Sequence, residues 1–291
     1  MNHFKTNHCR LLTLTFVFLF LATATNVFSQ ARKTINFDNG WQFIKEDVSG
    51  AEKPSFNDAQ WTKLNVPHDW SIEGQYDRAN PSSRGGGYLP TGIGWYRKTF
   101  TVDKADAKKL SSIEFDGVMA NSDVWINGKH LGKRPYGYTS FTYDLTPYLN
   151  FDKANVIAVR ADNSIQPASR YYTGAGIYRH VRLVTVNPTH FKHWGTFITT
   201  PVATTAKGLV NLKVEIDNKG ITGDYKLQIE IVDNKGTVVK TVESLKNIAA
   251  NATGLISQEI EIKNPKLWGF DAPNLYTANT KLYSGKTLVD N

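Results

Sequence analysis

The chain has 291 residues, a formal net charge of +8 and one cysteine, and aromatic residues make up 12% of it. Its 34 lysines and arginines are scattered rather than gathered in a run, which argues against a nucleic-acid-binding protein. A lone cysteine, Cys9, excludes a disulfide framework and a thiolate metal cluster.

The N-terminus has the three-part pattern of a secretory signal peptide. Lys5 and Arg10 precede an apolar run over residues 11–24, and small or apolar residues lead to Ser29. The run is shorter than the roughly 20 apolar residues that span a membrane. We therefore expect residues 1–29 to be a signal peptide cleaved after Ser29, and the mature chain to be periplasmic or secreted with no membrane partner. An uncleaved membrane anchor is the alternative.

Short strands separated by turn residues dominate the first half of the mature chain. Asn127 and Gly128 lie between two strand-like runs and predict a hairpin, because both residues tolerate positive φ. Residues 95–100 and 178–186 are also strand-like, whereas residues 103–112 favour one helical turn or a loop. A long loop rich in glycine, proline and serine, Gly74–Gly94, precedes the first of these strands.

Apolar and polar residues alternate in the second half of the chain. Residues 212–216, 227–231 and 259–262 have a period of two, which is typical of antiparallel sheets with one buried face. The turn sequence Asp-Asn-Lys-Gly follows the first two runs. We predict an all-β protein of two sandwiches, a loop-rich domain over residues 30–188 and a domain of immunoglobulin size over residues 189–291.

Aromatic and polar residues cluster around the long loop and a second glycine-rich segment near residue 172. Tyrosine and tryptophan offer flat apolar faces with a polar edge, which suit sugar rings, and glycine lets the backbone approach a ligand closely. A loop this long inside a compact domain is usually functional or disordered. The alternative is that the rings only fill the end of the sandwich. The cluster comprises His68, Asp69, Trp70, Trp95, Tyr96, Arg170, Tyr171 and Tyr172.

No sequence motif indicates a cofactor, a metal ion or covalent catalysis. The chain has no phosphate-binding loop, no nucleophile elbow and no dinucleotide fingerprint. His190 and His193 lack a third candidate ligand nearby, and no acidic cluster marks a calcium site. Asp69 and Glu73 are conceivable as the two carboxylates of a glycosidase, but no other residue supports that assignment. We expect no cofactor, no metal ion and no catalytic residue in this chain.

Several segments resemble, in the same order, the N-terminal sugar-binding domain of glycoside hydrolase family 2. They are residues 115–149 and the segments VPHDW, GIGWYRKTF, NVIAVRADNS and SRYYTGAGIYRHVRL. Residues 264–290 are similar to the late strands of the family's second domain. The resemblance covers nearly all of the mature chain and implies a jelly-roll β-sandwich followed by an immunoglobulin-like β-sandwich.

The resemblance implies a β-galactosidase-like enzyme that hydrolyses β-linked sugars with retention of configuration. In the family, a C-terminal (β/α)₈ barrel holds both catalytic glutamates, and the acid/base glutamate follows an asparagine. The dipeptide Asn-Glu is absent from these 291 residues. We therefore expect an N-terminal portion that is inactive alone, that has the barrel as its partner, and whose second sandwich lacks its last strand.

The resemblance also implies which residues line the substrate pocket, and a β-linked oligosaccharide is the expected ligand. Some β-galactosidases of the family have an aspartate at the position of Arg170, which weakens a prediction of galactose at that subsite. Two alternatives stay open: a stand-alone exported carbohydrate-binding module, and a purely structural pair of sandwiches, against which the long loops argue. The predicted substrate-binding residues are Asn163, Arg170, Tyr171 and Tyr172, followed by His68, Asp69 and Trp70.

Overall fold

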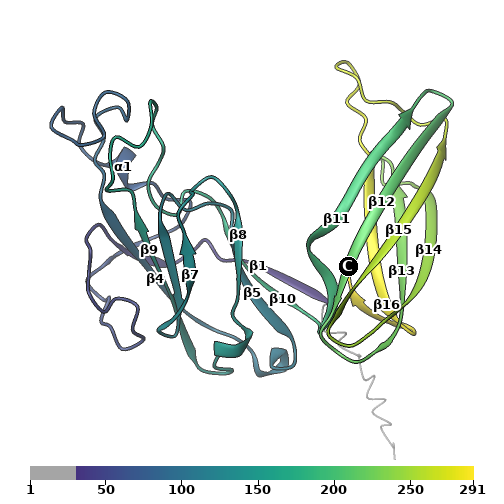
Figure 1. Cartoon of the computed structure of the whole chain (residues 1–291), viewed down its shortest axis with the longest axis horizontal. Coiled ribbons are helices and arrows are strands. Elements are labelled where there is room, and N and C mark those ends of the chain that lie inside the picture. Colours follow the sequence, from purple (N-terminus) through teal and green to yellow (C-terminus); the bar gives the residue numbers. More distant parts are fainter. Residues whose placement is uncertain (1–30) are drawn as a thin grey trace, which may run out of the picture.

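The structure, a computed structural model, describes residues 31–291. The predicted signal peptide and Cys9 lie outside the described residues. The chain forms two β-sandwiches that are connected between β10 (Val181–Val186) and β11 (Thr189–Ala203) (Figure 1). The predicted fold class is confirmed, since a jelly-roll sandwich is followed by an immunoglobulin-like one. No helix within the described range is long and apolar enough to cross a membrane.

Two antiparallel sheets form the first sandwich. One sheet has the strand order β1-β10-β5-β8 and the other has the order β3-β2-β4-β9-β6-β7. The elements other than β10 are β1 (Arg32–Asn36), β2 (Trp41–Ile44), β3 (Thr62–Leu64), α1 (Trp70–Glu73), β4 (Ile93–Thr101), η1 (Lys104–Asp106), β5 (Leu110–Phe115), β6 (Ser122–Ile126), β7 (Lys129–Arg134), β8 (Phe141–Asp144), η2 (Thr146–Tyr148) and β9 (Ala154–Asp162).

The main core lies between these two sheets because their strands alternate inward and outward side chains. On β6, for example, Val124 and Ile126 are fully buried, whereas Trp125 between them is partly exposed. The largest buried side chains of this core include Trp41, Tyr96 and Phe115. The predicted hairpin is confirmed, since β6 and β7 form it. The helical turn expected over residues 103–112 is confirmed in part, because η1 lies there but residues 110–112 belong to β5.

A layer that the sequence did not predict covers the outer face of the six-stranded sheet. The segment after β2, residues 45–61, packs there against Trp95 and Trp125, whose rings stack at 5.1 Å. Trp61 and Ala51 from the segment complete this second, smaller core. Strand β4 therefore buries side chains on both of its faces, as strands covered on both sides do.

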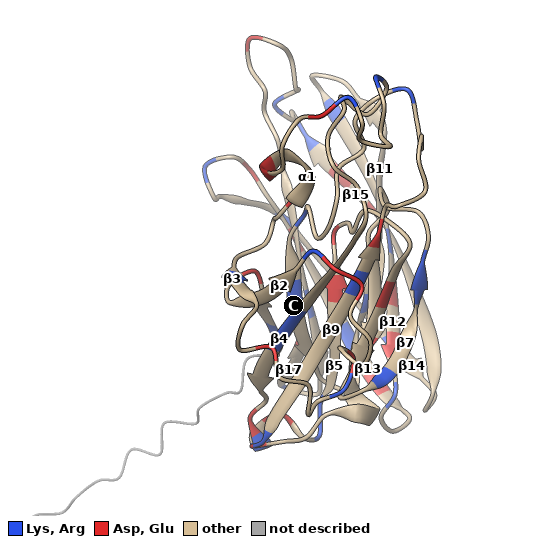
Figure 2. Cartoon of the chain, turned by 90° about the vertical axis from the view of Figure 1, so that its left-hand side faces the viewer, with Lys and Arg blue, Asp and Glu red and all other residues tan. Residues whose placement is uncertain are grey.

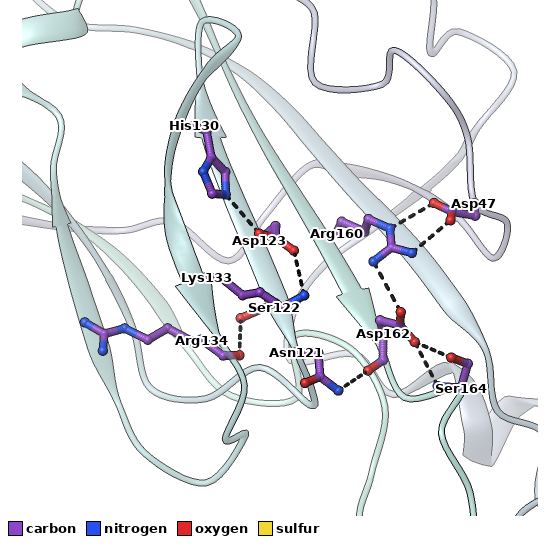
Figure 3. Close-up of polar contacts among 10 residues, drawn as sticks. All are labelled: Asp47, Asn121, Ser122, Asp123, His130, Lys133, Arg134, Arg160, Asp162 and Ser164. Carbon is purple, nitrogen blue, oxygen red and sulfur yellow. Dashed lines mark hydrogen bonds and ion pairs between the residues drawn. The ribbon is translucent and has the colours of Figure 1, made fainter.

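Charged side chains border this outer layer. The Arg160 guanidinium donates to both carboxylate oxygens of Asp47 at 2.9 and 2.8 Å and to Asp162 at 3.3 Å (Figure 3). This pairing holds the pKa of Asp47 below its usual value and raises the pKa of Arg160. Basic and acidic positions are interspersed along the strands (Figure 2).

The ammonium group of Lys98 is half-buried at the edge of the main core. Its Nζ donates to the carbonyl of Phe37 at 2.8 Å and lies 3.7 Å from the centre of the Phe37 ring. Burial lowers the pKa of Lys98 to about 8, although the Asp38 carboxylate opposes this shift. Lys98 therefore loses its proton at a lower pH in the native chain than in the unfolded chain.

This depressed pKa predicts a rise in stability with alkaline pH. Between pH 8 and the usual lysine pKa of 10.5, the unfolded chain holds a proton that the native chain has lost, so the free energy of unfolding increases with pH. Urea unfolding at pH 7.5 and 9.5 should show that the free energy of unfolding rises more with pH in the wild type than in Lys98→Met. The exposed Lys129→Met variant should behave as the wild type, and parallel pH profiles for all three proteins would contradict the prediction.

The second sandwich consists of a three-stranded sheet, β11-β12-β15, and a four-stranded sheet, β14-β13-β16-β17. The alternating runs of the sequence all form strands, and their apolar side chains meet in one core that includes Leu212, Ile229 and Ile260. The strands other than β11 are β12 (Lys207–Asn218), β13 (Gly223–Val232), β14 (Val238–Ile248), β15 (Ala252–Lys263), β16 (Thr277–Ser284) and β17 (Thr287–Asp290).

The two Asp-Asn-Lys-Gly sequences have different structural roles. The second, residues 233–236, is the hairpin turn between β13 and β14, with Gly236 at a φ of 83°. The first, residues 217–220, lies where the chain passes from one sheet to the other. There, Asn218 is fully buried, and its amide donates to the carbonyls of Ile221 and Ile248 at 2.8 and 3.0 Å.

Polar contacts connect the two sandwiches. The fully buried carboxylate of Asp290 accepts bonds from Arg32 Nε and Nη2 at 3.0 and 2.7 Å and from the backbone N–H of Phe191 at 2.7 Å. A four-residue bulge in β11 brings His193 to within 3.1 Å of Glu114 on β5. The junction is therefore built from specific hydrogen bonds rather than from a free linker.

The expectation that the second sandwich lacks its last strand stays a prediction. β17 pairs with β16 only opposite residues 282–284. From Thr277 to Lys281, β16 pairs with β13 on one side, and no described strand pairs with its other side.

Candidate functional site

The loops that hold most of the predicted site residues meet at one end of the first sandwich, next to α1 (Figure 1). Two segments face each other there, the long loop up to Gly92 and the segment from Asn163 to Gly176. Asn163 joins them, because its Oδ1 accepts from the N–H of Gly92 at 2.9 Å and its Nδ2 donates to the carbonyl of Gly174 at 3.2 Å. Asn163 is buried, so it positions the two loops.

Asp69 and Tyr172 form a second connection between these loops. One oxygen of Asp69 caps α1 by accepting from the N–H of Ser71 at 3.0 Å, and the other accepts from the Tyr172 hydroxyl at 2.5 Å. Burial, followed by this bond to Asp69, raises the pKa of Tyr172. The hydroxyl therefore stays protonated at neutral pH, while Tyr172 remains 37% exposed.

His68 and Trp70 lie beneath the surface. His68 Nδ1 is 2.7 Å from the hydroxyl of Tyr96, and its Nε2 is 3.1 Å from Glu73. Trp70 belongs to the main core and is 3% exposed. Asp69, between them in the sequence, accepts instead from Tyr172, so His68 and Asp69 do not orient each other. His68 and Trp70 support the loops from below.

Arg170 and Tyr171 are the exposed members of the site. Tyr171 is 62% exposed. Arg170 makes no hydrogen bond or ion pair within residues 31–291, and its guanidinium is free to bind a ligand. The backbone here packs tightly on the long loop, since a Cβ at Gly85 would lie 2.9 Å from the carbonyl oxygen of Ser169. The glycine therefore allows two loops to touch beneath an exposed cation and an exposed ring.

The loops form a rim rather than an enclosed pocket. The cleft between them, lined by residues such as Ser71, Pro90 and Tyr172, has a volume of about 10 Å³, enough for about one water molecule. A sugar ring would rest on this surface and would need further walls to be enclosed. The two nearby carboxylates have separate partners, Tyr172 for Asp69 and His68 for Glu73.

Glycine has a positioning role at this site that the sequence did not predict. A Cβ at Gly176 would lie 2.1 Å from the Tyr96 hydroxyl and 2.9 Å from the Trp70 ring, and the φ of Gly176 is 93°. Only glycine avoids both conflicts. The glycine spacing in the segment after Tyr172 was the available signal, but it did not reveal which rings the backbone approaches.

The paired sandwiches and their loop-built rim are an architecture that other proteins share. Residues 28–187 match the sugar binding domain of glycosyl hydrolases family 2, and residues 189–291 match a further domain described as glycosyl hydrolases family 2. The chain belongs to glycosyl hydrolase family 2.

Similar proteins include both galactosidases and glucuronidases. The chain is 45% identical over 260 residues to "Beta-galactosidase BoGH2A" of Bacteroides ovatus, covering 89% of this chain and 31% of that protein. It is 47% identical over 255 residues to a "Putative beta-glucuronidase" of Formosa agariphila, covering 88% of this chain and 24% of that protein.

Solved structures show the same arrangement. A glycosyl hydrolase family 2 member from Bacteroides cellulosilyticus superposes with a TM-score of 0.86 at 37% identity, covering 89% of this chain and 34% of that one. A beta-glycosidase from Bacteroides vulgatus superposes with a TM-score of 0.82 at 41% identity, covering 89% and 33%. The chain thus spans about a third or less of the length of these relatives.

Proposed function

We propose that this chain supplies substrate-pocket loops to an exported family 2 glycoside hydrolase, which hydrolyses β-linked sugars with retention of configuration. The observation that carries the proposal is the rim itself. Arg170 and Tyr171 are exposed, and the Tyr172 hydroxyl is fixed by Asp69 on loops that buried residues hold in place. Such an arrangement presents aromatic faces and polar edges to a sugar.

We propose that the carboxylates that break the glycosidic bond belong to a barrel outside these 291 residues. A retaining glycosidase needs two carboxyl groups about 5 Å apart that face the same bond. In the rim, Asp69 is engaged by Tyr172 and Ser71, and Glu73 pairs with His68. Neither is arranged as a nucleophile or as an acid/base partner for the other. The barrel would supply the remaining walls of the sugar pocket.

The proposed ligand is a β-linked galactoside or glucuronide, since relatives with both names match at similar identity. The unpaired guanidinium of Arg170 suits a sugar with a carboxylate, because arginine binds planar carboxylates through two parallel hydrogen bonds. A glucuronide is therefore the candidate that this single residue favours.

The proposal predicts weak sugar binding that depends on the rim. Ligand-observed NMR with methyl β-D-galactoside and methyl β-D-glucuronide should give a Kd near 1 mM for one of them, about 4 kcal/mol. Tyr172→Ala should weaken that binding about three- to tenfold, because a ring face and a fixed hydroxyl are lost. Tyr148→Ala is a matched control, since Tyr148 is 38% exposed but lies on η2, away from the rim.

Two results would contradict the proposal. Equal binding by the wild type and Tyr172→Ala would show that the rim does not contact the sugar. Turnover of nitrophenyl β-glycosides that survives repurification and disappears in Asp69→Asn would place the chemistry in this chain. Micromolar binding of a simple sugar would instead favour the stand-alone binding module, because the loops would then form a complete site.

A further inference from the structure

A row of three tyrosines lies beside the rim and has no part in the site described above. Tyr136 and Tyr138 lie in the loop between β7 and β8, and Tyr178 lies just before β10. The Tyr136 and Tyr138 ring centres are 5.6 Å apart at an interplanar angle of 67°, and those of Tyr138 and Tyr178 are 6.4 Å apart at 79°. Each of these two pairs of rings is therefore in edge-to-face contact.

The inner end of the row, Tyr178, is fixed by close contacts with the backbone. The Tyr178 hydroxyl donates to the carbonyl of Gly137 at 3.0 Å. A Cβ at Gly137 would lie 2.7 Å from the sulfur of Met119, and a Cβ at Gly117 would lie 2.9 Å from the Tyr178 hydroxyl. Backbone thus approaches the Tyr178 ring and Met119 where a side chain would not fit, which fixes the orientation of Tyr178 before any ligand arrives. Preorganised rings lose little conformational freedom on binding.

Folding does not explain why the outermost ring is aromatic. Tyr136 is 62% exposed and belongs to no core cluster of the described chain. Its neighbour Tyr138 is partly exposed, and the guanidinium of Arg179 lies 5.3 Å from the centre of the Tyr178 ring. The row therefore offers aromatic faces, hydroxyl groups and one cation to the solvent.

The row is continuous with the rim. The Tyr138 hydroxyl donates to the carbonyl of Thr173 at 3.4 Å, directly after Tyr172. Burial, followed by the neighbouring hydroxyl of Tyr171, raises the pKa of Tyr138. The exposed and partly exposed rings thus extend from Tyr172 through Tyr171 and Tyr138 to Tyr136.

We propose that Tyr136, Tyr138 and Tyr178 form a second sugar-contacting surface, which takes a unit of a β-linked oligosaccharide beyond the unit held at the rim. This inference rests on the proposed function and makes it more specific, because the substrate then is an oligosaccharide rather than a simple glycoside. Flat rings with polar edges suit the alternating C–H and hydroxyl surfaces of a sugar. Because Tyr138 contacts the rim segment at Thr173, these rings suit the next unit of the same sugar chain.

The test compares a monosaccharide with an oligosaccharide on the full chain. Ligand-observed NMR titrations use methyl β-D-galactoside and β-1,4-linked galactotetraose. The wild type should bind the tetraose about three- to tenfold more tightly, the gain expected from one or two aromatic contacts. Tyr136→Ala should abolish that gain and leave monosaccharide binding unchanged, Tyr136→Phe should keep it, and Tyr172→Ala should weaken both ligands.

The outcomes separate the two proposals. If the wild type binds both ligands equally, or if Tyr136→Ala still binds the tetraose more tightly, the proposal of a tyrosine surface is wrong. The proposal for the rim is not affected by either result. A chain that binds neither galactose-based ligand but binds methyl β-D-glucuronide counts against the tyrosine surface alone. A chain that also fails to bind methyl β-D-glucuronide counts against the rim and the tyrosine surface together. Tyr136→Ala should keep the melting temperature of the wild type because its side chain is exposed, and Tyr148→Ala again serves as the matched control.

Discussion

Replacing Asp290 by alanine should destabilise the chain by about 3 kcal/mol, the cost of removing one partner from a buried ion pair. Asp290 is fully buried and accepts two hydrogen bonds from Arg32 across the junction and one from the N–H of Phe191 within its own sandwich. Without the carboxylate, the Arg32 charge and a buried N–H lose their partners. The substitution therefore affects β1, the first strand of the first sandwich, and β11, the first strand of the second.

Urea unfolding and small-angle scattering measure the two consequences. We expect a lower free energy of unfolding for Asp290→Ala, a tendency of the two sandwiches to unfold in separate transitions, and a larger radius of gyration. Asp271→Ala, at an exposed loop position, is the control and should change neither measurement. If the stability and scattering of Asp290→Ala matched the wild type, the junction would not depend on this carboxylate.

A second large effect is expected for Arg97→Met, again about 3–5 kcal/mol. Arg97 is 1% exposed and lies on the outer face of β4. Its guanidinium donates to Asp58 at 2.8 Å and to the backbone carbonyls of Ala51 and Lys53. One side chain thus holds the covering segment, residues 45–61, against the sheet, and methionine fills the space without replacing any of these bonds.

The Arg97→Met variant should lose the outer layer before it loses the main core. Limited proteolysis should cut within residues 45–61 in the variant and leave the wild type intact. Arg160→Met removes a guanidinium from the same face, but that pair with Asp47 is partly exposed, so about 1 kcal/mol or less is expected. If both variants lost equal stability, the burial of Arg97 would not be the cause.

Local sequence was sufficient wherever structure depends on near neighbours. The Asn127-Gly128 hairpin follows from the tolerance of both residues for positive φ. The alternating runs of the second sandwich follow from a period of two, which places one set of side chains in a core. The site was harder to predict. Asn163 is a polar residue in a loop and Trp70 is an aromatic residue, and the sequence does not reveal whether such residues are buried or exposed.

The sequence by itself determined that this protein is all-β, that its strands are antiparallel, and that its family is glycosyl hydrolase family 2, because these properties are carried by alternation, turn residues and ordered motifs. Only the tertiary structure decided which residues of the loops face solvent. Asp69 accepts a hydrogen bond from Tyr172, which is 103 positions away in the chain, and Arg97 donates to Ala51, which is 46 positions away. Contacts at such separations depend on how the sheets pack, which no local pattern encodes.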